Sequence, residues 1–84
     1  MKKVMLVDDE IFITEGLMSI IDWKALGLEV VQSAGNGEEA IRKFKDNPVD
    51  IIVTDINMPV KTGLELVQEI NEMGKKVKFI TFIY

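Results

Sequence analysis

The chain has 84 residues, of which 48% are hydrophobic and 29% are charged, and its formal net charge is −4. This length allows at most one domain, and the composition is that of an ordinary soluble globular protein. The acidic balance argues against a general nucleic-acid-binding surface, and the lack of cysteine and histidine excludes disulfides, thiolate or imidazole metal sites and histidine-based catalysis.

The first half of the chain predicts a strand, a helix and a second strand. Residues 3–7 predict a strand, because residues 4–7 are apolar on consecutive positions, which is typical of a strand buried on both faces. Residues 11–21 have apolar residues at helical spacing, and residues 22–27 end this helix with Gly27 as its stop. Residues 28–34 form the second strand. The apolar run that ends at Val7 is too short for a signal peptide, and no window is long enough for a membrane span.

The second half predicts two more helices and two more strands. Residues 35–48 give the clearest helix signal, with Asn36 as the N-cap, Glu39 as a partner like that of a capping box, and Asn47-Pro48 as the stop. Residues 49–55 form the third strand, 63–73 the third helix and 78–84 the fourth strand. The helix residues expected to face the core are Ala40, Ile41, Phe44, Leu64, Leu66, Val67 and Ile70.

Strands therefore alternate with helices along the whole chain. This order implies parallel strand pairing, right-handed crossovers and helices on both faces of the sheet. We expect a three-layer α/β domain.

Acidic residues follow two of the predicted strands. Asp8, Asp9 and Glu10 follow the first strand, and Asp55 ends the third. In an open α/β sheet, ligands bind outside the carboxyl ends of the strands, so Asp8, Asp9 and Asp55 converge if these strands are neighbours. Three close carboxylates need positive charge between them, and Mg²⁺ suits this oxygen-rich site best. One carboxylate would then be free to act as a nucleophile toward phosphorus.

A simpler interpretation stays open for each acidic motif by itself. Acidic residues after a strand often cap the next helix, where they favour the positive end of its dipole. The run "DDE" alone is consistent with a solvated turn, and Asp55 alone with a turn residue. Their occurrence at equivalent ends of two parallel strands favours the functional interpretation.

Several stretches resemble a known family. "MKKVMLVDDE", "NGEEAI", "DIIVTDINMP" and "GLEL" resemble the receiver domain of bacterial two-component response regulators, and "IDWKALGLEVV" resembles receivers that precede an AraC-type DNA-binding domain. The resemblance covers essentially the whole chain. It implies a flavodoxin-like (CheY-like) fold with strand order 2-1-3-4-5. It also implies a phosphoacceptor for a sensor histidine kinase, with at most self-phosphorylation from phosphodonors and no enzymatic activity of its own. The lack of cysteine fits a reducing, cytoplasmic setting.

The resemblance also assigns roles to residues by position. It implies that Asp55 is the phosphoacceptor and that Asp8 and Asp9 hold Mg²⁺ together with Asp55. The main-chain carbonyl of Asn57 matches the backbone ligand of the metal.

The resemblance further implies that residues 1–84 are a truncated receiver domain. A receiver is about half as long again, so we expect a (βα)3β fragment that lacks the last helix, strand and helix. The lysine that pairs with the phosphoryl group would be missing with them. Counting from "GLEL" puts Ile83 at the position of the switch hydroxyl, and Thr81 would serve only if the preceding loop were two residues shorter.

Truncation would leave the fourth strand with an open edge. Because "FITFIY" is apolar and uncharged, we expect a homodimer that forms through this strand. Two functions stay open: a Mg²⁺-dependent aspartyl-phosphate acceptor, or a natural or engineered self-assembling scaffold in which the acidic site is a relic. An independent phosphatase ranks third, since it needs a second acid–base carboxylate and a substrate cap. None of these involves direct nucleic-acid or membrane contact.

Overall fold

The computed structural model describes residues 1–55 and 63–82. Its elements, in chain order, are β1 (Lys2–Val7), α1 (Ile11–Ile20), the short 3-10 helix η1 (Lys24–Leu26), β2 (Leu28–Ala34), α2 (Gly37–Asp46), β3 (Ile51–Asp55), α3 (Gly63–Glu72) and β4 (Lys78–Phe82). Among these residues, no helix is both long and apolar enough to cross a membrane.

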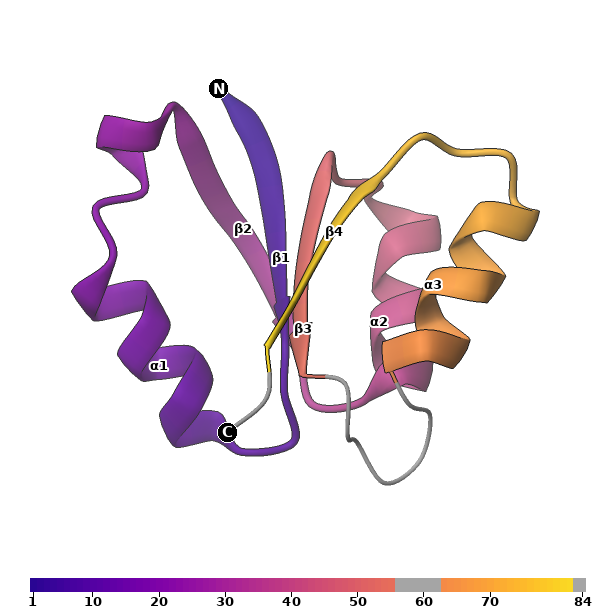
Figure 1. Cartoon of the computed structure of the whole chain (residues 1–84), viewed down its shortest axis with the longest axis horizontal. Coiled ribbons are helices and arrows are strands. Elements are labelled where there is room, and N and C mark those ends of the chain that lie inside the picture. Colours follow the sequence, from indigo (N-terminus) through magenta and orange to yellow (C-terminus); the bar gives the residue numbers. More distant parts are fainter. Residues whose placement is uncertain (56–62, 83–84) are drawn as a thin grey trace.

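All strands pair in parallel, in the order β2-β1-β3-β4. The helix α1 covers one face of the sheet, while α2 and α3 cover the other (Figure 1). The predicted three-layer α/β architecture is therefore confirmed, as is the part of the flavodoxin-like strand order that these four strands represent.

The central strands β1 and β3 are apolar on consecutive positions because each is covered on both faces. All five residues of β3 are buried, and so are the last four of β1. Between the sheet and the helices α2 and α3, buried side chains form one apolar cluster, which includes Met5 and Ile52 of the sheet and Phe44 of α2. Those that point toward α1 form a smaller cluster around Leu6, and it is lined by half-buried side chains such as Trp23.

Helix α1 is less buried than its apolar sequence suggests. Of its ten residues, all of them described, Thr14 alone is buried, and Phe12 and Ile20 are 82% and 83% exposed. The end of the helix is fixed by the indole of Trp23, whose Nε1–H donates to the carbonyl of Leu17 at 3.2 Å. Gly27 was predicted to stop this helix, but α1 ends at Ile20, and Gly27 instead caps η1 with a left-handed φ of 74°.

Helices α2 and α3 confirm most of the predicted core positions. Asn36 caps α2, because its Oδ1 accepts the N–H of Glu39 at 2.9 Å. Leu66 and Ile70 of α3 are buried as expected, but Leu64 is 65% exposed, so its predicted inward position is wrong. Leu64 precedes Leu66 by two residues, which is about 200° around a helix, so the two cannot share one face.

Candidate functional site

The strand register brings the predicted acidic residues together. Val7 of β1 pairs with Thr54 of β3, so the next residues, Asp8 and Asp55, come at the same level of the sheet. With Asp9 they form a cluster in which one carboxylate oxygen from each residue lies within 4.8 Å of the others. Asp8 and Asp55 are buried, at 2% and 6% exposure, while Asp9 is exposed. The predicted convergence of these residues is therefore present in the fold.

Hydrogen bonds with the neighbouring main chain and side chains hold Asp8 and Asp55 in place. The N–H of Asp8 donates to the carbonyl of Ala34 at the end of β2, at 3.1 Å. The Oδ1 atom of Asp8 accepts the N–H of Glu10 at 2.8 Å, which sets the direction of its carboxylate. The hydroxyl of Thr54 donates to the carbonyl of Asp55 at 2.9 Å. The positions of the buried acids thus follow from the ends of the strands and the turn after β1.

The cluster fits a hard divalent cation. Two direct ligands of one Mg²⁺ lie at most about 4.2 Å apart, because each Mg–O distance is about 2.0–2.1 Å. Oxygens up to 4.8 Å apart can hold such an ion if a side chain rotates slightly or if one carboxylate binds through water. Mg²⁺ normally keeps several waters, and its charge would relieve the repulsion among the acids.

A cavity of about 230 Å³ lies beside the cluster. It is lined by Asp8, Asp9, Ile11, Thr14, Ser33, Ala34, Gly35, Glu39 and Lys43. Sequence reasoning missed the contribution of β2 and α2 to this wall. The spacing of Glu39 and Lys43, four residues apart on the predicted helix, could have indicated that their side chains lie next to each other.

An ion pair forms one side of this cavity. The Lys43 ammonium lies 3.1 Å from Glu39 Oε1 and donates to the carbonyl of Ser33 at 2.6 Å. The same Glu39 oxygen accepts the N–H of Gly35 at 3.3 Å. The hydrogen bond from Lys43 is the largest cause that lowers the pKa of the Glu39 carboxyl, and desolvation opposes it.

The remaining predicted site residues lie at or beyond the limits of the described chain. Asn57 and Ile83 fall outside the described residues, so their roles stay predictions. Thr81 pairs with Thr54, and Phe82 pairs with Asp55. Because side chains alternate along a strand, Thr81 shares a face with Thr54 rather than with Asp55. The switch role of Thr81 also stays a prediction.

Residues 4–83 match the family described as "Response regulator receiver domain". Over 80 residues the chain is 39% identical to the "uncharacterized transcriptional regulatory protein YesN" of Bacillus subtilis, a match that spans 95% of this chain and 22% of that protein. The fold is similar to a two-component transcriptional regulator AraC from Clostridium phytofermentans, with a TM-score of 0.89 and 32% identity over 96% of this chain and 65% of that one. It is also similar to a CheX–CheY–BeF3–Mg²⁺ complex from Borrelia burgdorferi, with a TM-score of 0.82 and 32% identity over 95% of this chain and 60% of that one. The chain thus spans less than two thirds of the length of each of these proteins.

Proposed function

The chain belongs to the response regulator receiver domain family, and from this premise we propose that it accepts a phosphoryl group on Asp55 with Mg²⁺ bound beside it. Receiver domains are phosphoacceptors of two-component signalling, and they interact with histidine kinases. The observation that carries the proposal is the convergence of Asp8, Asp9 and Asp55 at the carboxyl edge of the sheet. The Borrelia burgdorferi neighbour, described as a complex with BeF3 and Mg²⁺, supports the same assignment.

In the proposed reaction, a carboxylate oxygen of Asp55 attacks the phosphorus of a phosphohistidine. The new O–P bond forms as the P–N bond breaks, and the imidazole leaves as the histidine of the donor. Asp8, Asp9 and Asp55 would hold Mg²⁺, and the main-chain carbonyl of Asn57 is predicted as a further ligand. When bound, this ion neutralises charge on the phosphoryl oxygens. A carboxylate nucleophile has no proton to lose as it attacks phosphorus, so this role of Asp55 calls for no general base.

The proposed donor is a sensor histidine kinase, and the proposed output is transcriptional. YesN and the Clostridium phytofermentans neighbour are both named as transcriptional regulators, which supports this output. We place the chain in the cytoplasm, in line with its cysteine-free composition. We assign neither nucleic-acid nor membrane contact to these 84 residues.

The test is native mass spectrometry after incubation with Mg²⁺ and a small acyl-phosphate donor. We expect one phosphoryl group per chain, and we expect Asp55→Asn to abolish it. Asp22→Asn is the matched control, because Asp22 is exposed and an asparagine can still accept the N–H of Ala25, as Asp22 Oδ1 does at 3.2 Å. Persistence of the adduct in Asp55→Asn, or its absence from the unsubstituted chain, would contradict the proposal.

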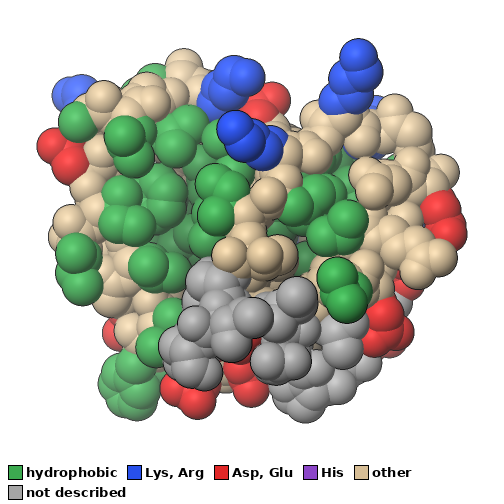
Figure 2. Space-filling model, viewed as in Figure 1, with side chains coloured by type: hydrophobic (Ala, Val, Ile, Leu, Met, Phe, Trp, Pro, Cys, Tyr) green, Lys and Arg blue, Asp and Glu red, His purple; other side chains and the backbone are tan. Residues whose placement is uncertain are grey.

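A second candidate function, self-assembly, is favoured by the position of β4. Among the described strands, β4 lies at the edge of the sheet and pairs with β3 on one side. Ile80 is 45% exposed, and hydrophobic side chains gather on the face of the molecule that β4 crosses (Figure 2). We propose that two copies pair along β4. A two-fold axis perpendicular to the sheet makes the two strands antiparallel and brings the two Ile80 residues together.

Light scattering coupled to size exclusion tests this association. One chain has a mass of 9.5 kDa, so a dimer has twice that mass, 19.0 kDa. We expect a dimer that Ile80→Lys dissociates and Leu64→Lys leaves intact, because Leu64 is exposed on α3 rather than at the strand edge. A monomer at every concentration tested would exclude self-assembly while leaving phosphoryl transfer open.

A further inference from the structure

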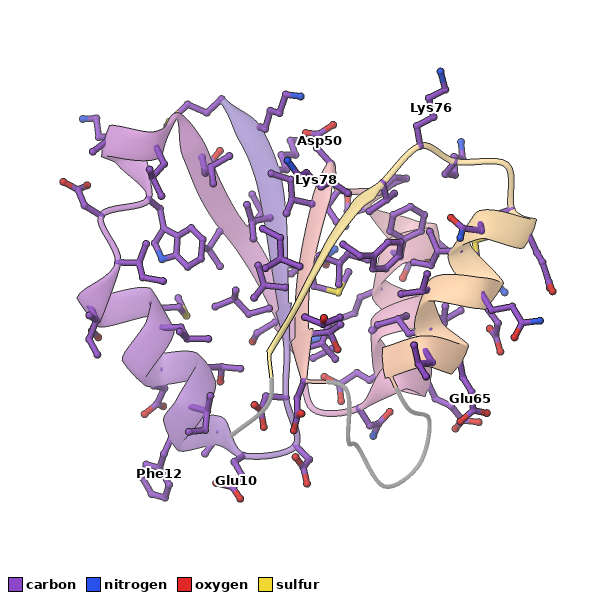
Figure 3. The ribbon with its side chains drawn as sticks, viewed as in Figure 1. Glu10, Phe12, Asp50, Glu65, Lys76 and Lys78 are labelled. Atoms are coloured by element: carbon purple, nitrogen blue, oxygen red, sulfur yellow. The ribbon has the colours of Figure 1, made fainter. Side chains whose placement is uncertain are left out.

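A basic hollow lies at the amino edge of the sheet, at the opposite end of the strands from the acidic cluster. It has a volume of about 500 Å³ and is lined by Lys2, Asp50, Asn71, Lys75, Lys76, Val77 and Lys78. These residues come from the start of β1, the residue before β3, the end of α3, the segment between α3 and β4, and the start of β4. Figure 3 labels Asp50, Lys76 and Lys78 at this end, and Glu10 and Glu65 at the other.

The main chain under the hollow is held by three hydrogen bonds around Asp50. Its N–H donates to the carbonyl of Lys3 at 2.9 Å, and its carbonyl accepts the N–H of Lys78 at 3.0 Å. Its Oδ2 atom accepts the N–H of Lys3 at 2.8 Å. The carboxylate of Asp50 thus accepts a hydrogen bond from the backbone of β1. Together these hydrogen bonds fix the starts of β1, β3 and β4 relative to one another.

The hollow is positively charged, although the chain as a whole has a negative net charge. Four lysines and one aspartate give it a formal charge of +3, so the rest of the chain, with a total of −4, carries −7. Within the described residues, none of the four ammonium groups lies within 4 Å of a carboxylate. Within the described chain these lysines therefore form no ion pair, and Asp50 offsets one of their four charges.

We propose that this hollow docks an acidic polypeptide segment of a partner protein. The hollow is open, and its lining consists mainly of lysine side chains, with one half-buried apolar residue, Val77. Such a lining suits a run of carboxylates better than an apolar ligand. The described residues that line the hollow include neither arginine nor an aromatic side chain, the groups that bind phosphates bidentately or stack on bases. The excess negative charge elsewhere also repels a long polyanion such as DNA.

Fluorescence anisotropy with a labelled ten-residue polyglutamate peptide tests the proposal. We expect binding that weakens steeply between 20 and 150 mM salt. Each exposed lysine–carboxylate pair is worth about 1.5- to 5-fold in affinity, so Lys75→Gln/Lys76→Gln should weaken binding by roughly 2- to 25-fold. Lys24→Gln/Lys45→Gln makes the same change in net charge at exposed lysines outside the hollow, and should leave the affinity within twofold.

Equal losses for the two double variants would overturn the proposal, because they would show that binding follows net charge alone. Tighter binding of a duplex oligonucleotide than of the peptide at equal salt would also overturn it. The readout is independent of the phosphoacceptor proposal, since it involves neither Asp55 nor Mg²⁺. Asp55→Asn should bind the peptide as the unsubstituted chain does.

Discussion

Removal of one carboxylate from the acidic cluster should stabilise the metal-free protein. The oxygens of Asp8, Asp9 and Asp55 lie within 4.8 Å of one another. Two unit charges at that distance repel by about 3.5 kcal/mol at an effective dielectric constant of 20, and by about 0.9 kcal/mol in bulk water. A loss of hydrogen bonding at Asp55 offsets about 1 kcal/mol of the gain. Asp55 faces both Asp8 and Asp9. After this offset, Asp55→Asn should raise the free energy of unfolding by about 1 kcal/mol if both repulsions are screened as in bulk water, and by about 2.5 kcal/mol if a single repulsion acts at a dielectric constant of 20.

The assay is urea unfolding in metal-free buffer and in Mg²⁺. At a Mg²⁺ concentration ten times its Kd, binding should stabilise the unsubstituted chain by about 1.4 kcal/mol, and Asp55→Asn should lose most of this gain. Asp22→Asn, which removes an exposed carboxylate, should resemble the unsubstituted chain in both buffers. The reasoning is refuted if Asp55→Asn is no more stable than Asp22→Asn without metal, or if Mg²⁺ stabilises both variants equally.

Two further predictions concern the start of α2. Asn36→Ala removes the acceptor for the N–H of Glu39 and should cost about 1 kcal/mol, a fall in Tm of about 4–8 °C by calorimetry for a domain of this size, whereas Asn36→Asp should keep the cap. The hydrogen bond from Lys43 lowers the pKa of the Glu39 carboxyl below its ordinary value of 4.5. The ionised Glu39 carboxylate therefore stabilises the folded chain above pH 4.5, and this contribution is lost as the pH falls through the lowered pKa. Glu39→Gln should therefore be less stable than the unsubstituted chain in urea at pH 7, and the difference should shrink toward pH 3; a constant difference would contradict this account.

The arrangement of the sheet and the acidic cluster was predictable because both follow from strand patterns. Consecutive apolar residues mark β1 and β3 as strands covered on both faces, and such strands occupy the centre of a parallel sheet. Once they are neighbours, the residues after Val7 and Thr54 must meet at one edge. The position of Asp8 beside Asp55 is thus a consequence of two local patterns and one topological rule.

Other features depend on neighbours that sequence spacing does not identify. The apolar residues of α1 indicate a helix, but the adjoining surface covers little of it, so Phe12 and Ile20 stay exposed. Glu39 was expected to act as in a capping box, yet its carboxylate accepts from Gly35 and Lys43. A lysine one turn further along the helix competes for that carboxylate, and the outcome depends on the path of the preceding loop.

The parallel register of the sheet also has a consequence for folding during synthesis. The closest strand partners, Lys2 with Leu28, lie 26 residues apart, so no pair of strands can close through a short turn. Val4 of β1 pairs with Ile51, which is 51 − 4 = 47 residues later. At about 5–20 residues per second, the ribosome needs roughly 2–9 s to add that segment. Strand β1, with four consecutive buried residues in the folded protein, therefore stays without its central partner for seconds after it is made, and a chaperone can bind it during that time.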